Sequence, residues 1–358
     1  MSTYGLLSRL LHHIALGSRA LREASFDLDQ NVAGSKNKRP SAMLEKPTFV
    51  TGLARSGTSI LLKTLYETEA FTTLTYRDMP FVLAPRLWRR IAGRYGKTGE
   101  ERERAHADGI AISFDSPEAF EEVFWLTFAG DRYLRNDRLV AHSADNDTVD
   151  AFRRYVGAII NAADQGQNAN KLDRRYLSKN NNNVLRLGTL RRAFPKGTII
   201  VPFRNPYDQA NSLLQQHRLF SARHVEDPFS LRYMRWLGHF EFGGDHRPFD
   251  FGNGIENLQR SDPDTLDHWL IHWILVYESI LAQAELDLLL FDYDAFCRAP
   301  ESVMDRVTRR LCIAAISNLD EIRAPRPYEP TSGKKSEFLS HAEDVHAALR
   351  ARCFMESP

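Results

Sequence analysis

The stretch 48-TFVTGLARSGTSILLKTL-65 decides the fold class. A short apolar run leads into a glycine-containing turn, and an amphipathic segment follows the turn. This order of strand, loop and helix is typical of a phosphate-binding loop. Nucleotide hydrolases carry a lysine after the second glycine of such a loop, whereas this chain has Thr58 there and places Arg55 ahead of the glycine. The stretch therefore predicts an anion site that lacks the usual lysine.

The residue types of this loop suit an anion. Gly52 and Gly57 permit a tight backbone path. Backbone amides of the loop and of the helix N-terminus then point at the ligand, and Thr58 and Ser59 add hydroxyl donors. Arg55 brings one guanidinium beside the bound group. A purely structural turn is the alternative interpretation.

A second anion site is predicted in 199-IIVPFRNPYDQANSLLQQH-217. A strand delivers Arg204 at its carboxyl end, Pro206 begins a helix, and Ser212 lies two turns into it. Open parallel sheets bind ligands at the carboxyl ends of their strands. An arginine and a serine at that edge would clamp a phosphate by charge-assisted hydrogen bonds. The alternative is an arginine at the sheet edge and a serine on a solvated helix face.

Strands and helices alternate along the chain. Strands are expected over 47–52, 174–179, 196–205 and 286–296, and helices over 57–68, 184–194, 206–217 and 264–285. This alternation predicts an α/β protein, a P-loop-like three-layer fold with a central parallel sheet flanked by helices. Residues 1–45 are expected to form an N-terminal helical extension and linker, and 46–358 the α/β domain. Within it, 218–262 has no clean periodicity and is expected to be an irregular insertion.

Bulk composition limits the possible partners and compartment. The net charge of the 358 residues is +1, which gives no case for nucleic acid. Three widely spaced cysteines fit a reducing compartment, so a cytoplasmic location is expected. No run reaches the roughly 18 to 20 apolar residues of a membrane span. Leucines near helical spacing within 6–16 predict a helix packed on the body or on a second subunit of a homo-oligomer, with peripheral membrane contact as the alternative.

Two segments together carry a family resemblance. G-L-A-R-S-G-T-S (52–59) followed by F-R-N-P-Y-D-Q-A-N-S (203–212) resembles the paired signature of sulfotransferases, which use 3′-phosphoadenosine 5′-phosphosulfate (PAPS) as co-substrate. The resemblance implies that the 5′-phosphosulfate is held by Arg55, Ser56, Gly57, Thr58 and Ser59, and the 3′-phosphate by Arg204 and Ser212. A sulfuryl group carries little charge and needs no magnesium, so no metal is expected. The arginine would stabilise charge on the leaving phosphate.

The general base is less clear from the resemblance. Cytosolic members use the histidine of a K-x-H segment, but 178-SKNNNN-183 offers Lys179 and then Asn181, which cannot act as a base. Other branches use a carboxylate downstream of the loop. The stretch 75-TYRDMPF-81 therefore implies Asp78 as the catalytic base, with Arg77 to bind an anionic acceptor or orient Asp78. Lys179 is assigned to the bridging oxygen or the sulfuryl group. An N-cap or ion pair for Asp78, and a surface position for Lys179, are the alternatives.

The acceptor is expected to be a saccharide or glycolipid. The stretch 236-WLGHFEFGGDHRPFDFGN-253 combines aromatic rings with His239, Asp245, His246 and Arg247, which suits a sugar ring, and a packed irregular insertion is the alternative. His246 is a second acid–base candidate. The tail lacks the R-K-G loop of the cytosolic branch, so the chain resembles the bacterial carbohydrate-type branch. Transfer of a sulfuryl group from PAPS to a hydroxyl is the expected function. The alternatives are a P-loop nucleotide kinase or hydrolase, which would need magnesium, and a non-catalytic nucleotide-binding protein.

Overall fold

The computed structural model describes residues 6–32, 44–92, 102–103, 111–112, 118–163, 174–316, 319–320, 322, 328 and 336–353. Its centre is a five-stranded parallel sheet with the strand order β2-β6-β1-β7-β9. The strands are β1 (Thr48–Val50), β2 (Phe71–Thr72), β6 (Arg175–Lys179), β7 (Thr198–Phe203) and β9 (Leu289–Asp292). The predicted parallel sheet is thus confirmed.

The sheet is buried because its strands are apolar on both faces. In β1 every residue is buried, and in β7 all but the first. The register places Val50 beside Lys179 on one side and beside Ile200 on the other. The carboxyl ends of β1, β6 and β7 therefore lie together along one edge of the sheet, its carboxyl edge. The predicted site residues stand at or shortly after these strand ends.

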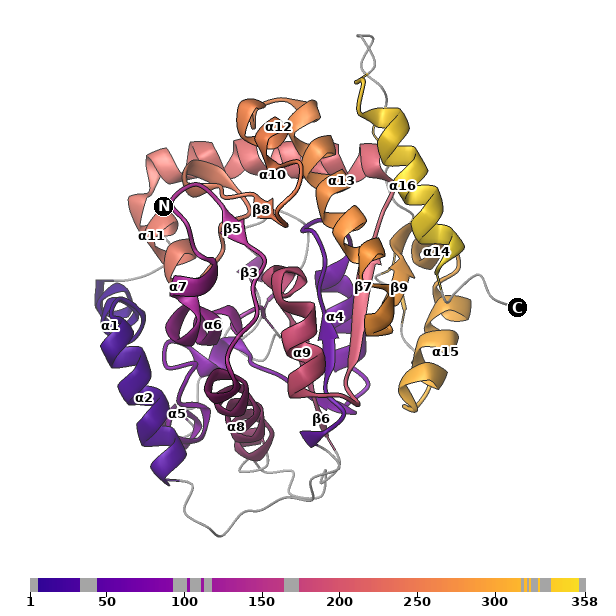
Figure 1. Ribbon diagram of the computed structural model, residues 1–358. Coiled ribbons are helices and arrows are strands. Elements are labelled where there is room, and N and C mark those ends of the chain that lie inside the picture. The colour runs from indigo at the N-terminus through magenta and orange to yellow at the C-terminus, as the bar shows by residue number, and fades with distance from the viewer. Residues whose placement is uncertain are drawn as a thin grey trace.

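Helices cover both faces of this sheet, which confirms the flanked α/β architecture (Figure 1). The connection from β1 through α4 (Thr58–Tyr66) leads toward the β2 edge, and the connection from β6 through α9 (Leu187–Ala193) leads toward the β9 edge. Parallel crossovers are right-handed, so opposite directions of travel put α4 and α9 on opposite faces. In Figure 1, α9 lies in front of the strands and α4 behind them.

The remaining elements surround this core. The other helices are α1 (Leu6–Leu16), α2 (Arg19–Val32), α5 (Pro85–Ala92), α6 (Glu122–Phe128), α7 (Gly130–Tyr133), α8 (Asn146–Ala163), α10 (Pro206–Glu226), α11 (Pro228–Leu237), α12 (Ile255–Arg260), α13 (Leu266–Ala282), α14 (Tyr293–Arg298), α15 (Pro300–Leu311) and α16 (Leu339–Ala351). Two strand pairs stand apart from the sheet, antiparallel β3 (Arg102–Glu103) with β4 (Ala111–Ile112), and parallel β5 (Leu139–Val140) with β8 (Phe249–Asp250).

The N-terminal helices pack on the body of the protein. Asp29 of α2 is fully buried, and it accepts hydrogen bonds from Arg86 Nε at 2.9 Å and from the Leu87 amide at 2.8 Å. This bond pattern joins α2 to the first turn of α5. In the described part of the chain, no helix combines the length and the apolar character that a bilayer crossing requires. The division into 1–45 and 46–358 stays a prediction.

The segment 218–262, expected to be an irregular insertion, contains regular helices in its first part. α10 continues to Glu226 and α11 follows at once, whereas 238–254 holds only a short 3-10 turn and strand β8. Asp227 caps α11 by accepting a hydrogen bond from the Phe229 amide at 3.2 Å, and Pro228 occupies the first helical position. An N-cap followed by proline restarts the helical phase, and this break hides the periodicity of both helices.

Candidate active site

The loop between β1 and α4 turns through two left-handed residues. Arg55 has a φ of 66° and Gly57 a φ of 90°. A Cβ on Gly57 would lie 2.1 Å from the ring of Tyr293, so only glycine fits there. The loop consequently passes tightly against the Tyr293 ring and delivers the backbone amides of the first turn of α4 to the carboxyl edge of the sheet.

Arg55 connects the two predicted anion segments. Its Nε donates a hydrogen bond to Ser212 Oγ at 3.0 Å. Ser212 sits in α10, which begins where the Asn205 side chain accepts a hydrogen bond from the Asp208 amide at 3.1 Å. The structure therefore brings the first loop and the second segment together at one point.

Arg204 follows β7 and lies near the ring of Tyr293. Its guanidinium carbon is 5.8 Å from the centre of the Tyr293 ring, and its Nε is 3.7 Å from Asp294 Oδ1. Burial raises the pKa of Asp294, while the Asn205 amide and Arg204 act to lower it. The Asn205 amide donates to Asp294 Oδ2 at 2.7 Å, which ties the end of β7 to α14. Gly57 and Arg204 thus border the same aromatic ring.

Gln209 of α10 stabilises the loop by a hydrogen bond to its backbone. Its Nε2 donates to the carbonyl of Ala54 at 2.9 Å, and its Oε1 accepts from Trp273 Nε1 at 2.9 Å. Tyr277 OH donates to the carbonyl of Pro202 at 2.9 Å. Trp273 and Tyr277 are fully buried, so this face of α13 packs in the core.

Lys179 ends β6 at the same edge, and Asn181 follows it. Lys179 is buried, with 8% of its surface exposed. Asn181 Oδ1 lies 3.5 Å from Thr58 Oγ1, and Asn181 Nδ2 donates to Glu241 Oε1 at 3.1 Å. The asparagine at the expected histidine position therefore links the phosphate loop to a carboxylate from another part of the chain.

Two buried glutamates at the start of α6 hold the segment that follows β6 in place. Glu121 accepts hydrogen bonds from Asn183 Nδ2 at 2.9 Å and from Asn180 Nδ2 at 3.3 Å. Glu122 accepts from Asn180 Nδ2 at 2.8 Å and from Arg186 at 2.9 Å. All five side chains are buried, and hydrogen bonds between buried polar groups favour one conformation. The run of asparagines is therefore ordered by its partners.

Asp78 occupies a different environment from the one that a base requires. It is fully buried, and Arg89 binds both of its oxygens, with Nε at 2.6 Å from Oδ1 and a terminal nitrogen at 2.8 Å from Oδ2. The Thr75 amide also donates to Oδ2, at 2.8 Å, so Asp78 closes a capping box. These contacts give Asp78 a structural role. Its assignment as base stays a prediction, and it would require breaking the ion pair with Arg89.

The predicted acceptor residues lie apart from the phosphate loop. His246 is 3.0 Å from His268 through their Nε2 atoms, and burial together with neighbouring histidines lowers its pKa well below the usual value. Arg247 donates to the carbonyl of Arg135 at 2.7 Å and lies over Phe240 at 4.5 Å. His246 packs against α13, and Arg247 is also paired with Asp245 at 3.1 Å. Their role in binding an acceptor stays a prediction.

The remaining predicted site residues, Arg77, Ser56 and Ser59, differ in their exposure. Arg77 is exposed, and its carbonyl accepts a hydrogen bond from Trp88 Nε1 at 2.9 Å. Ser56 is buried within the loop, whereas Ser59 in the first turn of α4 is partly exposed. Among the described residues, no group of three His, Cys, Asp or Glu side chains is arranged to hold a metal ion.

Sequence reasoning missed three residues that border this site, namely Glu241, Tyr293 and Asp294. Tyr293 and Asp294 follow β9, which ends at the same sheet edge as β7. A strand-end rule applied to β9 would have found them. Glu241 alternates with two buried phenylalanines, and this alternation was the only available signal.

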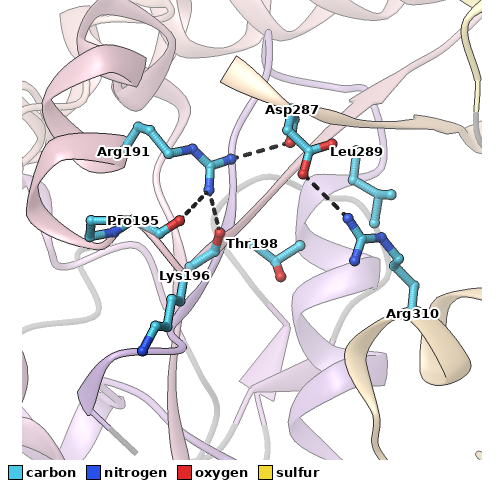
Figure 2. A pocket seen from close by; sticks show the side chains of 8 residues that line it. Arg191, Pro195, Lys196, Thr198, Asp287, Leu289 and Arg310 are labelled. Atoms are coloured by element: carbon cyan, nitrogen blue, oxygen red, sulfur yellow. Dashed lines mark hydrogen bonds and ion pairs between the residues drawn. The ribbon is translucent and has the colours of Figure 1, made fainter. Parts of the chain in front are cut away.

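A cavity of about 150 Å³ lies at the opposite end of the sheet (Figure 2). Thr198 and Leu289, the first residues of β7 and β9, line it. Arg191 points into it and donates to the carbonyls of Gly197 at 2.8 Å and Pro195 at 3.2 Å. Arg191 and Arg310 are thus engaged with the backbone and with Asp287, and Lys196 is paired with Glu45. The cavity is remote from the phosphate loop.

Residues 47–243 match the profile of the sulfotransferase family. Among solved structures, a sulfotransferase from Mycobacterium avium is 15% identical, with a TM-score of 0.44 and coverage of 94% of this chain and 75% of that chain. One from Mycobacterium tuberculosis is 13% identical, with a TM-score of 0.40 and coverage of 95% and 80%. One from Alicyclobacillus acidocaldarius is 14% identical, with a TM-score of 0.39 and coverage of 88% and 96%. No curated protein matches the sequence.

Proposed function

Since the chain belongs to the sulfotransferase family, we propose that it transfers a sulfuryl group from PAPS to a hydroxyl group of an acceptor. The observation that carries the proposal is the 3.0 Å hydrogen bond between Arg55 and Ser212. It joins two anion-binding segments that end different strands of one sheet. A nucleoside with phosphate groups at both its 3′ and 5′ positions matches two such segments side by side.

Each segment has a role in this proposal. The amides before α4, with Ser56, Gly57, Thr58 and Ser59, hold the 5′-phosphosulfate. Arg204 and Ser212 hold the 3′-phosphate, and Arg55 stabilises charge on the leaving oxygen. Lys179 lies at the end of β6 beside Val50, which places it at the same edge as the loop. We assign Lys179 to the bridging oxygen, and no step requires a metal ion.

A polyol acceptor such as a saccharide or glycolipid fits the residues near Lys179. His239 and Glu241 are polar and partly exposed, and Asn181 beside Glu241 is buried. The three side chains offer hydrogen bonds to several hydroxyl groups. An apolar phenol or steroid would form fewer hydrogen bonds with these groups than a polyol would. The three cysteines are free thiols, which agrees with a cytoplasmic location.

Titration calorimetry with adenosine 3′,5′-bisphosphate, and separately with Mg-ATP, tests the function. The bisphosphate should bind tightly, and Arg204→Ala should weaken it by about 10- to 100-fold because a charged phosphate contact is lost. Arg309→Ala, at an exposed position of α15, is the matched control and should not change affinity. Preference for Mg-ATP would favour a kinase or hydrolase instead, and no binding of either ligand would remove the proposal.

A further inference from the structure

A histidine from a distant part of the chain lies beside the position where the K-x-H histidine is missing. Residues 239–242 alternate between partly exposed and buried side chains. Phe240 and Phe242 are buried in the core, with 3% of their surfaces exposed. Alternation along an extended segment puts His239 and Glu241 on one shared face. That face meets Asn181.

Glu241 belongs to the active-site edge through its contacts. Its Oε1 accepts a hydrogen bond from Asn181 Nδ2 at 3.1 Å, and the other end of the same amide is 3.5 Å from Thr58 Oγ1. Burial by itself raises the pKa of Glu241, but His239 and Lys179 outweigh burial and bring the pKa to about 2. The carboxylate is therefore ionised at neutral pH and lies within the field of Lys179.

Glu241 also orients the imidazole of His239. His239 Nδ1 lies 3.4 Å from Glu241 Oε2 and 3.5 Å from Oε1. A carboxylate at this nitrogen favours the tautomer in which Nδ1 carries the proton, and it leaves Nε2 on the far side of the ring as a proton acceptor. The side chain of His239 retains 21% of its surface exposed, so an acceptor molecule has access to it.

The turn that carries His239 is fixed by the buried network of the site. Gly238 ends α11 with a φ of 75°, and its carbonyl accepts a hydrogen bond from Asn182 Nδ2 at 3.0 Å. A Cβ on Gly238 would lie 2.4 Å from Glu122 Cγ, so the turn packs directly on the carboxylate that orders the asparagine run. The position of His239 relative to β6 is therefore built into the fold.

We propose that His239 is the general base of the reaction and that Glu241 is its positioning residue; this assignment rests on the proposed sulfotransferase function. His239 Nε2 takes the proton of the acceptor hydroxyl while the acceptor oxygen forms a bond to sulfur. The bond between sulfur and the bridging oxygen breaks, and its electron pair leaves with adenosine 3′,5′-bisphosphate. The imidazolium then returns its proton to solvent. The segment that carries His239 contacts the residues after β6, where the proposed sulfuryl transfer takes place, whereas Asp78 is held in its ion pair with Arg89.

The test uses PAPS with water as the acceptor, because no acceptor need then be identified. Release of adenosine 3′,5′-bisphosphate from PAPS is measured for the wild-type chain, His239→Gln and Glu241→Gln, together with calorimetric affinity for the bisphosphate. His239→Gln should keep the affinity and reduce release by about 100-fold or more, the usual contribution of a general base. His341→Gln, on the exposed face of α16, is the matched control and should behave as the wild type.

The pH profile separates a base from a structural residue. Release by the wild type should fall in acid as the imidazole is protonated, release by His239→Gln should lose this dependence, and Glu241→Gln should shift it. Added imidazole should restore part of the activity of His239→Gln. Normal affinity with unchanged release in His239→Gln would overturn the base assignment alone. A wild-type chain that neither binds the bisphosphate nor releases it from PAPS would remove the proposed function and this assignment together.

Discussion

Arg55 and Ser212 are 157 positions apart in the sequence, yet Arg55 Nε donates a hydrogen bond to Ser212 Oγ at 3.0 Å. The bond joins the loop after β1 to the helix after β7. Under the proposed function, this bond would let one guanidinium contact both ends of a bisphosphate ligand, with the arginine held in place before the ligand arrives. Preorganisation of this kind lowers the cost of binding.

Ser212→Ala should therefore weaken binding of adenosine 3′,5′-bisphosphate by about 10-fold, since a hydrogen bond to a charged group contributes roughly 1.5–3 kcal/mol and water replaces part of it. The melting temperature should change little. Calorimetry measures the affinity, and Ser221→Ala on the same helix is the matched control. Equal affinities of the two variants would contradict a role for Ser212.

Gly57→Ala should destabilise the loop. The backbone φ of 90° is unfavourable for alanine, and a Cβ added here would lie only 2.1 Å from the Tyr293 ring, which leaves no room for a side chain. We expect a loss of at least about 1 kcal/mol in the free energy of unfolding by urea, together with loss of nucleotide binding. Gly188→Ala is the matched control. Gly188 lies in α9, and a Cβ added there would meet no atom within 4 Å, so this substitution should leave stability unchanged or increase it.

Asp78→Asn should lower stability as well as turnover. Arg89 would lose its charge partner, and breaking a buried ion pair typically costs about 3–5 kcal/mol. The double variant Asp78→Asn/Arg89→Gln removes both charges and should recover much of the stability. Recovery of turnover in the double variant would show that Asp78 acts through structure. A stable double variant without turnover, which still binds the bisphosphate, would instead support Asp78 as the base.

Stability should decrease in acid because several histidines are buried in the neutral form. Burial lowers the pKa of His142 and His272 to about 3 and that of His268 to about 4. In the unfolded chain a histidine binds its proton near pH 6.5. The unfolded state therefore binds more protons between about pH 6.5 and 4, and stability present above pH 6.5 is lost as the pH falls through this window.

Urea unfolding at several pH values measures this effect. Each such histidine contributes a slope of at most about 1.4 kcal/mol per pH unit. His272→Gln should make the dependence shallower, whereas His341→Gln, whose side chain is 56% exposed, should leave it unchanged. A free energy of unfolding that stays constant from pH 7 to 5 would contradict the neutral burial of these side chains.

Much of the fold follows from local sequence. The apolar run at 48–50, the left-handed turn at Gly57 and the helix after it are local, because short-range sterics and backbone hydrogen bonding decide them. The same holds for the β7 strand and for Pro206 at the start of α10. Alternation of such units predicts a covered parallel sheet, and the structure has one. The helices within 218–262 escaped prediction because a cap and a proline divide their periodicity.

The candidate active site follows from the sequence only in part. The sequence determined that Lys179 and Arg204 stand at strand ends and that Arg55 lies in the loop after a strand, because strand ends can be read from apolar runs. Only the tertiary structure decided that Asp78 is bound by Arg89 and that His239 and Glu241 reach Asn181. These partners come from segments far apart in the chain, and their meeting depends on how helices pack on the sheet. Local patterns carry no information about such packing, since burial and charge pairing are properties of the folded whole.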